Sequence, residues 1–247
     1  MQGMQGIYFQ FRLVPALVTL AGVALFIHLG QWQGSKAALR AQQMQQYETR
    51  MAQPPADLGT VLIQADHDHW HNAPVRVQGV YEADKQFFID NQQFQARPGL
   101  HVITPLKIDG GTTRVLVNRG WVAWGDSRAV LPSVATPAGA VAVTGVAVQP
   151  EVKKAFMTPD RPSPMVQLWE RLDLERFARQ NPGALQPVVV LQAQQDAPND
   201  GLVRQWPAPQ NKVMMHQGYS LQWYGMAAAL VIFFLVASVR RKGKVPP

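Results

Sequence analysis

The six histidines of the 247-residue chain are the side chains best suited to bind a metal or to change charge near neutral pH. Three of them, His67, His69 and His71, alternate in sequence, and on a β-strand this spacing would put all three imidazoles on one face. Such a face could bind zinc, copper or nickel. Polar residues surround them just before the first predicted strand, so a solvated loop is the interpretation that we favour.

His216 and His28 stand near the ends of two apolar segments and are more informative. Tyr219 and Trp223 follow His216 at i+3 and i+7, and on a helix these three residues share a face. An ionisable group at a membrane boundary is costly and often functional, and neutral imidazole is a common ligand of haem iron. From the residue types alone, a hydrogen-bonded interfacial histidine is the favoured interpretation of both.

Gly120 interrupts a predicted strand between Arg119 and Trp121, which indicates a β-bulge or a close approach of the backbone. Arg119 could pair with an acidic side chain of its own domain or with a propionate or phosphate group. We favour the internal carboxylate pair on residue type alone.

The sequence offers little support for catalysis. It contains no Gly-x-Ser-x-Gly, Ser-x-x-Lys or His-Glu-x-x-His motif and no glycine-rich phosphate loop. The absence of cysteine excludes disulfides, thiol nucleophiles and cysteine-ligated zinc or iron–sulfur sites. We therefore expect a non-enzymatic protein in which imidazole is the main ligand for any metal or haem.

Residues 13–35 and 217–239 form two segments of 23 residues without Asp, Glu, Lys or Arg. About 20 apolar residues cross a bilayer core as a helix. The alternatives are a cleaved signal peptide for the first segment and a buried core helix for the second. The first apolar run exceeds the roughly 7–15 residues of a signal peptide, and basic residues follow the second, so we expect two membrane spans. Aromatic residues typical of a membrane interface stand at one end of each segment: Trp32, Tyr219, Trp223 and Tyr224.

Four basic residues in the tail 240–247 predict a cytoplasmic C-terminus by the positive-inside rule. Arg12 before the first segment and Lys36 and Arg40 after it argue for the opposite orientation, but their bias is smaller. The chain then divides into five parts: a cytoplasmic N-terminus (1–12), a first transmembrane helix (13–33), an extracytoplasmic domain (34–216), a second transmembrane helix (217–239) and a basic cytoplasmic tail (240–247).

The middle of the chain is predicted to be mainly β. Residues 36–51 are good helix formers that extend the first helix as far as the prolines at 54 and 55, and residues 172–180 predict one further helix. Residues 109–112, Asp-Gly-Gly-Thr, are typical of a hairpin turn. Together these elements indicate a small β-barrel or sandwich with one or two helices. Seven short apolar runs predict its strands: 75–81, 86–90, 101–108, 114–118, 121–124, 141–148 and 188–192.

The net charge of +7 and the pI of about 9.9 would suit a nucleic-acid binder if the basic residues were clustered in the folded domain. Their positions in the sequence argue against this. Arg12 and the four basic residues of the tail carry five of the seven charges. The region between Lys36 and Lys212 has 18 basic and 16 acidic residues, which leaves it only +2. We therefore expect no nucleic-acid partner.

Five motifs, in this order, resemble the surfeit locus protein 1 family of cytochrome c oxidase assembly factors. The fourth is the most specific, and Lys36 and Arg40 follow the first at spacings where the family usually has Arg and then Lys. The motifs are Leu-Gly-Gln-Trp-Gln at 29–33, Val-Gln-Gly-Val-Tyr at 77–81, Gly-Leu-His-Val-Ile-Thr-Pro-Leu at 99–106, Val-Asn-Arg-Gly-Trp-Val at 117–122 and His-Gln-Gly-Tyr-Ser-Leu-Gln-Trp-Tyr-Gly at 216–225.

The resemblance implies two membrane spans around an extracytoplasmic β domain, and a role in the maturation of oxidase subunit I. Bacterial members of the family have been linked to haem a, and their haem-linked histidine corresponds to His216. The implied site has His216 as axial ligand, Tyr219, Trp223 and Trp32 nearby, and Arg119 at the propionates. His28 and the histidines at 67–71 match no family motif.

The implied partners are subunit I, haem a synthase, other oxidase assembly factors and membrane lipid, with the central domain in the periplasm of a bacterial inner membrane. A rival interpretation is a cofactor-free scaffold that holds an assembly intermediate. A third is a tethered metalloprotein that uses His67, His69 and His71.

Overall fold

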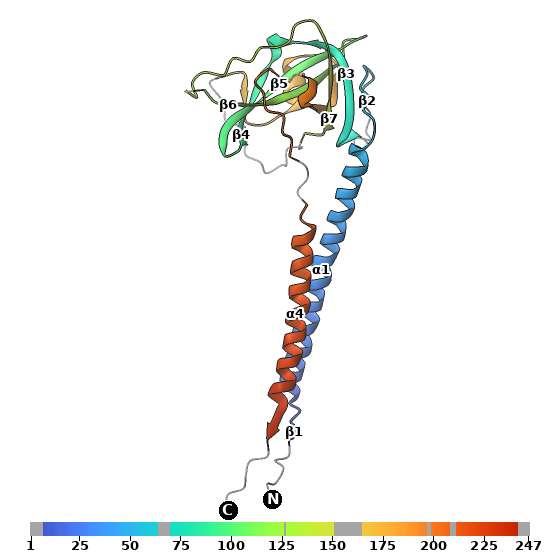
Figure 1. The fold of residues 1–247 in the computed structure, drawn as a ribbon, viewed down its shortest axis with the longest axis vertical. Coiled ribbons are helices and arrows are strands. Elements are labelled where there is room, and N and C mark those ends of the chain that lie inside the picture. The colour runs from blue at the N-terminus through green and yellow to red at the C-terminus, as the bar shows by residue number, and fades with distance from the viewer. Residues whose placement is uncertain are drawn as a thin grey trace, which may run out of the picture. The chain divides into compact units, whose positions relative to one another are not determined.

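The computed structural model describes residues 7–63, 70–125, 127–150, 165–196, 199–207 and 211–241. The chain forms two compact units. The first, which we call the helical unit, contains Met1–Gln46 and Pro209–Pro247, and the second, the β domain, contains Tyr47–Ala208. Two long apolar helices near the chain ends therefore flank a mainly β domain, as the sequence predicts (Figure 1).

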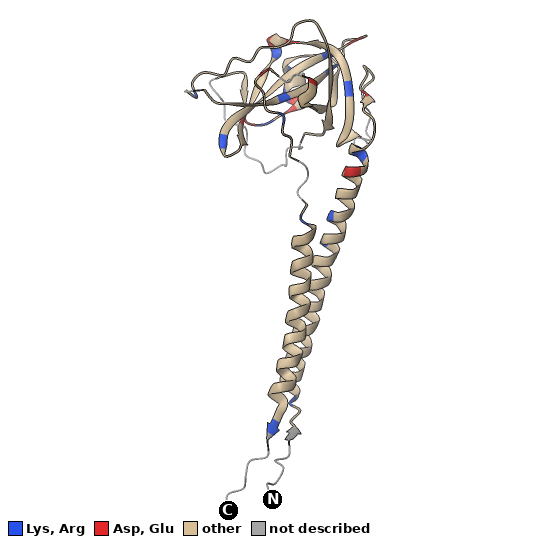
Figure 2. Ribbon diagram, in the orientation of Figure 1, with Lys and Arg blue, Asp and Glu red and all other residues tan. Residues whose placement is uncertain are grey.

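The helices of the helical unit are α1 (Leu13–Met51) and α4 (Val213–Ser238). Both are long and apolar enough to cross a membrane, by length and composition, and charged side chains are absent from their apolar stretches (Figure 2). α1 extends well past its apolar segment, as residues 36–51 predict. α4 begins at Val213, before Gln217, the predicted start, and the side chain of Asn211 accepts a hydrogen bond from the amide of Val213 at 3.1 Å. His216 therefore lies inside the helix.

The two helices run antiparallel and pack along a seam of buried and half-buried residues (Figure 1). These residues recur at intervals of three and four on both helices, which is the spacing of packed helix pairs. The seam consists of Thr19, Val23, Phe26, Gly30, Gln33 and Ala37 on α1, and His216, Ser220, Trp223, Ala227 and Leu230 on α4.

Small residues bring the two helices close together. A Cβ atom at Gly22 would lie 2.7 Å from Leu230, and one at Gly30 would lie 2.8 Å from the ring of Tyr224. The Ser220 hydroxyl donates a hydrogen bond to the carbonyl of Gly30 at 2.8 Å. Glycine and serine at such positions are typical of helix pairs that depend on close packing rather than on large apolar side chains.

Two short strands join the far ends of the helical unit. β1 (Ile7–Phe9) pairs antiparallel with β10 (Val239–Arg241), and the amide of Gln10 donates to the carbonyl of Ser238 at 2.8 Å. Phe9 contacts Phe234 edge-on, with 6.4 Å between the ring centres. Strands of three residues are too short for a hydrophobic pattern to predict them.

The β domain contains one sheet with the strand order β2-β3-β7-β9-β6-β5-β4-β8. β3 also pairs with β5, so β3, β7, β9, β6 and β5 form a closed circuit of hydrogen-bonded strands. Two 3-10 turns, η1 (Ala83–Lys85) and η2 (Gln194–Asp196), lie between strands. The strands are β2 (Ala56–Asp57), β3 (Ala73–Tyr81), β4 (Phe87–Phe94), β5 (Arg97–Ile108), β6 (Arg114–Ala123), β7 (Ala140–Val148), β8 (Leu168–Trp169) and β9 (Leu185–Gln192).

Alternate residues of the strands divide the core into separate clusters. Val115 and Val117 of β6 face one cluster, together with Val77 of β3, whereas Leu116 between them faces a second cluster with Phe177. This alternation is what the pleat of a strand imposes. Phe177 lies on α3 (Leu174–Gln180), a short helix that covers the second cluster.

The runs predicted on either side of Arg119 form one strand, β6, because a β-bulge lets the strand continue. Val102 of β5 lies opposite Gly120, whereas Ile103 lies opposite Asn118, so Arg119 is the extra residue. Gly120 has a φ of 141°, a conformation that favours glycine. The bulge indicated by the sequence is therefore confirmed.

The other predicted strands correspond to β3, β4, β5, β7 and β9, with ends that differ by a few residues. The helix predicted at 172–180 begins at Leu174, because the side chain of Asp173 accepts a hydrogen bond from the amide of Arg176 at 2.9 Å and caps it. The hairpin turn at 109–112 joins the antiparallel strands β5 and β6, as predicted.

Candidate functional site

The imidazole of His216 and the amide of Gln33 meet across the seam of the helical unit. Nδ1 of His216 lies 2.8 Å from Oε1 of Gln33, and both residues are half-buried. An amide oxygen can only accept, so Nδ1 donates in this contact, and in the neutral ring Nε2 then keeps its lone pair. Within the described parts of the chain, no residue pairs with Nε2. Metal-binding histidines typically have this arrangement, with the second ring nitrogen donating to an oxygen.

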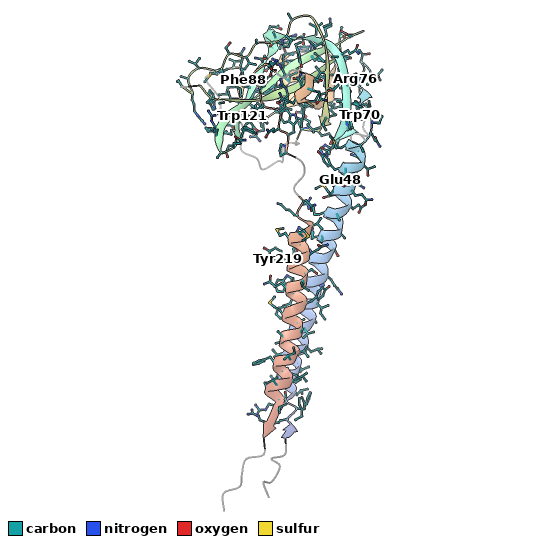
Figure 3. The ribbon with its side chains drawn as sticks, viewed as in Figure 1. Glu48, Trp70, Arg76, Phe88, Trp121 and Tyr219 are labelled. Atoms are coloured by element: carbon teal, nitrogen blue, oxygen red, sulfur yellow. The ribbon has the colours of Figure 1, made fainter. Side chains whose placement is uncertain are left out.

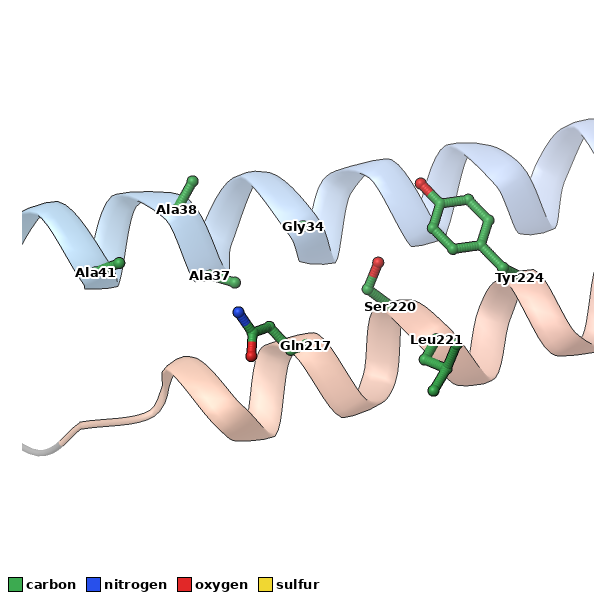
Figure 4. A pocket seen from close by; sticks show the side chains of 8 residues that line it. All are labelled: Gly34, Ala37, Ala38, Ala41, Gln217, Ser220, Leu221 and Tyr224. Carbon is green, nitrogen blue, oxygen red and sulfur yellow. The ribbon is translucent and has the colours of Figure 1, made fainter.

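An open groove of about 450 Å³ lies along the two helices, next to His216 in sequence (Figure 4). The small side chains of α1 create it, and its walls are mainly apolar. The Ser220 hydroxyl points towards α1, where it already donates to Gly30. His216 itself is not one of the lining residues, which are Gly34, Ala37, Ala38, Ala41, Gln217, Ser220, Leu221 and Tyr224.

The aromatic residues of the predicted site fall into two groups. Trp223 lies in the seam and contacts Phe26, with 5.7 Å between the ring centres. Tyr219 projects from α4 and is 48% exposed (Figure 3). Trp32 is 51% exposed, and the Lys36 ammonium lies 5.9 Å from its ring centre. The structure thus places His216 and Trp223 in the seam, and Tyr219 and Trp32 on the surface of the helix pair.

Arg119 belongs to the β domain and is almost completely buried. Its guanidinium donates to Oε1 of Gln86 at 3.2 Å, to the hydroxyl of Thr136 at 3.3 Å and to the carbonyl of Ala135 at 2.8 Å. It also lies 3.6 Å from a carboxylate oxygen of Asp200. The internal Arg–carboxylate pair, one of the two interpretations of Arg119, is therefore confirmed. Burial lowers the pKa of Arg119 from its ordinary value.

Asp200 is a residue that sequence reasoning missed. It accepts hydrogen bonds from Arg204 and from the amide of Leu202. Burial acts to raise the pKa of Asp200, but the hydrogen bonds from Arg204 and Leu202 and the charges of Arg204 and Arg119 hold it below the ordinary value. No local sequence pattern identifies Asp200. Its partner Arg119 lies on a distant strand, and its partner Arg204 lies in an irregular segment.

The alternating histidines cannot be compared as a set, because His67 and His69 lie outside the described residues. Nδ1 of His71 accepts a hydrogen bond from the amide of Gln149 at 3.3 Å. Residues 7–63, 70–125, 127–150, 165–196, 199–207 and 211–241 contain no group of three or more His, Asp or Glu that could hold a metal ion. His28, on α1, is exposed.

His101 of β5 is a second histidine with a defined environment. Its ring contacts that of Trp206 edge-on, with 5.5 Å between the centres. Burial lowers the pKa of His101 to about 4. His101 is therefore neutral at physiological pH.

The chain combines two long apolar helices with a β domain inserted between them, and a hydrogen bond orients the imidazole of His216 on one helix. These features define a class of β-domain proteins that carry a pair of apolar helices. The sequence model of the SURF1 family matches residues 20–228, and the chain belongs to this family. That range includes most of α1, α4 as far as Ala228, and the whole β domain. The family resemblance of the five motifs is thereby confirmed.

Individual relatives agree with this assignment. The chain is 27% identical to Surfeit locus protein 1 of Xenopus tropicalis, over 91% of this chain and 76% of that protein. It is 25% identical to Surfeit locus protein 1 of Mus musculus, over 86% of this chain and 72% of the relative. With the SURF1-like protein of Monosiga brevicollis it shares 24% identity, over 96% and 89% of the two chains.

Proposed function

We propose that this protein is a non-enzymatic assembly factor for cytochrome c oxidase that assists the maturation of subunit I. The observation that carries the proposal is the family match over residues 20–228, because it includes the larger part of each long helix and the β domain rather than one module. The absence of catalytic motifs from the sequence agrees with a role in binding. Haem a synthase and other oxidase assembly factors are the further partners.

The proposed site for haem a is the helical unit at the outer edge of the membrane, where Nε2 of His216 would bind the iron. The donor set fits, because Nδ1 of His216 is engaged by Gln33 and an apolar groove lies next along α4. A bound haem would supply the cofactor that subunit I needs. Tyr219 and Trp32 offer exposed aromatic surface for the macrocycle.

Arg119 fits the propionates of haem poorly, because its guanidinium is buried among partners of the β domain. Lys36 is the better candidate for them. It is exposed on α1, four residues from Trp32.

In the proposed topology, residues 13–33 and 217–239 cross a bacterial inner membrane, and both termini are cytoplasmic. The β domain is then periplasmic, and the closed circuit of five strands supports a small β-barrel. The support for the spans is the length and apolarity of α1 and α4. Membrane lipid is accordingly a further partner.

A cofactor-free scaffold is the second candidate. One observation favours it: Arg119, in the most specific family motif, is engaged within its own domain. Under this function the helices and the β domain hold an assembly intermediate of subunit I, and no haem is bound.

An absorption spectrum separates the two functions. We expect the full-length protein, purified from cells that make haem a, to show a Soret band that is lost in His216→Ala. His28→Ala is the matched control, because His28 is an exposed histidine of the other helix. A wild-type protein without a Soret band excludes the haem function, and equal haem in wild type and His216→Ala excludes His216 as the ligand.

A further inference from the structure

The contacts of Gly30 fix the register of α1 against α4 one helical turn from His216. Ser220 donates to the carbonyl of Gly30, and the ring of Tyr224 lies where a Cβ of Gly30 would be. Gln33 follows Gly30 by three residues and His216 precedes Ser220 by four, so in an antiparallel pair they form the next contact along the seam. The amide of Gln33 is therefore held opposite the imidazole by the packing of the backbones.

The atom that Gln33 presents to Nδ1, its amide oxygen, decides which ring nitrogen of His216 can bind iron. With an acceptor opposite Nδ1, the proton stays on Nδ1 and the lone pair stays on Nε2. Without the acceptor, nothing among the described residues holds the proton on Nδ1. A neutral amide also forms a weaker hydrogen bond to the imidazole than a carboxylate partner would, because carboxylate hydrogen bonds are charge-assisted.

We propose that Gln33 is a positioning residue that sets the tautomer of His216 and thereby presents Nε2 as a haem ligand that can still be released. The inference rests on the proposed function, in which His216 ligates haem and passes it on. A neutral partner suits a carrier, since a carboxylate at the same position would hold the iron more firmly.

Gln33→Leu and Gln33→Glu test the proposal in the full-length protein in detergent micelles. Leucine keeps the approximate size of the side chain without an acceptor, and glutamate keeps the acceptor. Gln31→Leu is the matched control, since Gln31 is exposed two residues away on the same helix. Circular dichroism of each variant shows whether the helices are retained.

The first measurement needs no haem. Nitrogen-15 NMR of the His216 ring is expected to show the Nδ1–H tautomer in wild type, Gln33→Glu and Gln31→Leu, and to lose it in Gln33→Leu. The second measurement is titration with hemin. We expect affinity to fall about 10- to 100-fold in Gln33→Leu, the usual cost of losing such a partner. Gln31→Leu should match wild type, and Gln33→Glu should release hemin more slowly to apomyoglobin.

The outcomes separate the inference from the function on which it rests. If hemin binds through His216 and Gln33→Leu changes neither the tautomer nor the affinity, Gln33 has no positioning role and the inference alone is overturned. If wild type binds no hemin, the proposed haem function is overturned, and the inference falls with it even where the tautomer is as expected. Slow release from Gln33→Glu, with wild-type affinity in Gln31→Leu, supports the inference.

Discussion

At the residue scale, two buried arginines of the β domain share one carboxylate. Arg119 and Arg204 both contact Asp200, and their side chains are at most 1% exposed. Two cations and one anion in a buried site tolerate the loss of a partner poorly, because the remaining polar atoms lose hydrogen bonds that water cannot replace. The stability of the β domain should therefore depend on this group of residues.

Arg119→Met should destabilise the protein by about 3 kcal/mol, because it removes a buried charge and leaves the carbonyl of Ala135 without its donor. Urea unfolding of the full-length protein, followed by tryptophan fluorescence, measures the change. Arg97→Met is the control, since Arg97 is exposed and its loss should change stability by no more than about 0.5 kcal/mol. Equal effects of the two substitutions would contradict a structural role for Arg119.

His101 should make stability depend on pH between about 4 and the ordinary histidine pKa of about 6.5. The folded protein resists protonation in this window while the unfolded chain accepts a proton, so stability is full above it and falls as the pH falls through it. Unfolding of His101→Gln measured at pH 7.5 and pH 5 should show a smaller difference than wild type. The same difference in both proteins would assign the dependence to another group.

Two carboxylates affect the stability of the folded protein at lower pH than His101 does. The pKa values of Glu82 and Asp200 lie below the ordinary values, because hydrogen bonds and charges from arginine and lysine overcome the effect of burial. Their contribution to stability is present above the unfolded-state pKa of about 4 and is lost as the pH falls below it. The effect of His101 can therefore be measured separately above about pH 5.

At the scale of elements, the helix pair depends on small residues in the seam and beside it. Gly22 and Gly30 have no room for a side chain, whereas a Cβ at Gly218 on α4 would meet nothing within 4 Å. The same substitution at Gly30 and at Gly218 should therefore affect the packing of the two helices differently, although both glycines lie in apolar helices.

Gly30→Leu should separate the helices, because a leucine there collides with Tyr224. The chain has no cysteine, so a pair introduced at Gly34 and Ser220 reports on the helix contact without background. Oxidative cross-linking of this pair should be reduced in Gly30→Leu and unchanged in Gly218→Leu. Equal cross-linking in both would show that the close approach at Gly30 is not needed.

The elements that the sequence predicts are those with a local signal, and the features that it does not predict depend on contacts between distant residues. Short apolar runs identified β3, β4, β5, β6, β7 and β9, and the glycine next to Arg119 identified the bulge, because these signals are local. His216 was identified by its motif and its place beside an apolar segment. Its partner Gln33 was not, since it is 183 residues away and the pairing depends on the register of two helices. Asp200 and the strands β1, β2, β8 and β10 were missed for lack of any local pattern.

At the scale of the whole molecule, the basic tail is expected to determine orientation. Four basic residues follow α4, and the positive-inside rule then predicts a cytoplasmic C-terminus. A green fluorescent protein fused to the C-terminus should fluoresce, and an alkaline phosphatase fused there should be inactive. Replacing the four basic residues by glutamine should lower the fluorescence, because only the weaker and opposite bias of Arg12, Lys36 and Arg40 then remains. Active phosphatase at the wild-type C-terminus would contradict the proposed topology.

The closed circuit of strands limits how the β domain can recognise an incompletely folded partner. β3 pairs with β7 along nearly its whole length, and on its other side with β2 at Val75 and Arg76 and with β5 at Gly79–Tyr81. β4 is covered by β8 at Phe88 and Ile89. Beyond Ile89, β4 is irregular, with Asn91 at a φ of 58°, and such irregularities discourage the addition of a further strand. A client chain would therefore find no long, regular backbone edge among the described strands to extend. Recognition would fall to side chains, loops and the helices, which select a partner by shape and chemistry rather than by exposed peptide groups.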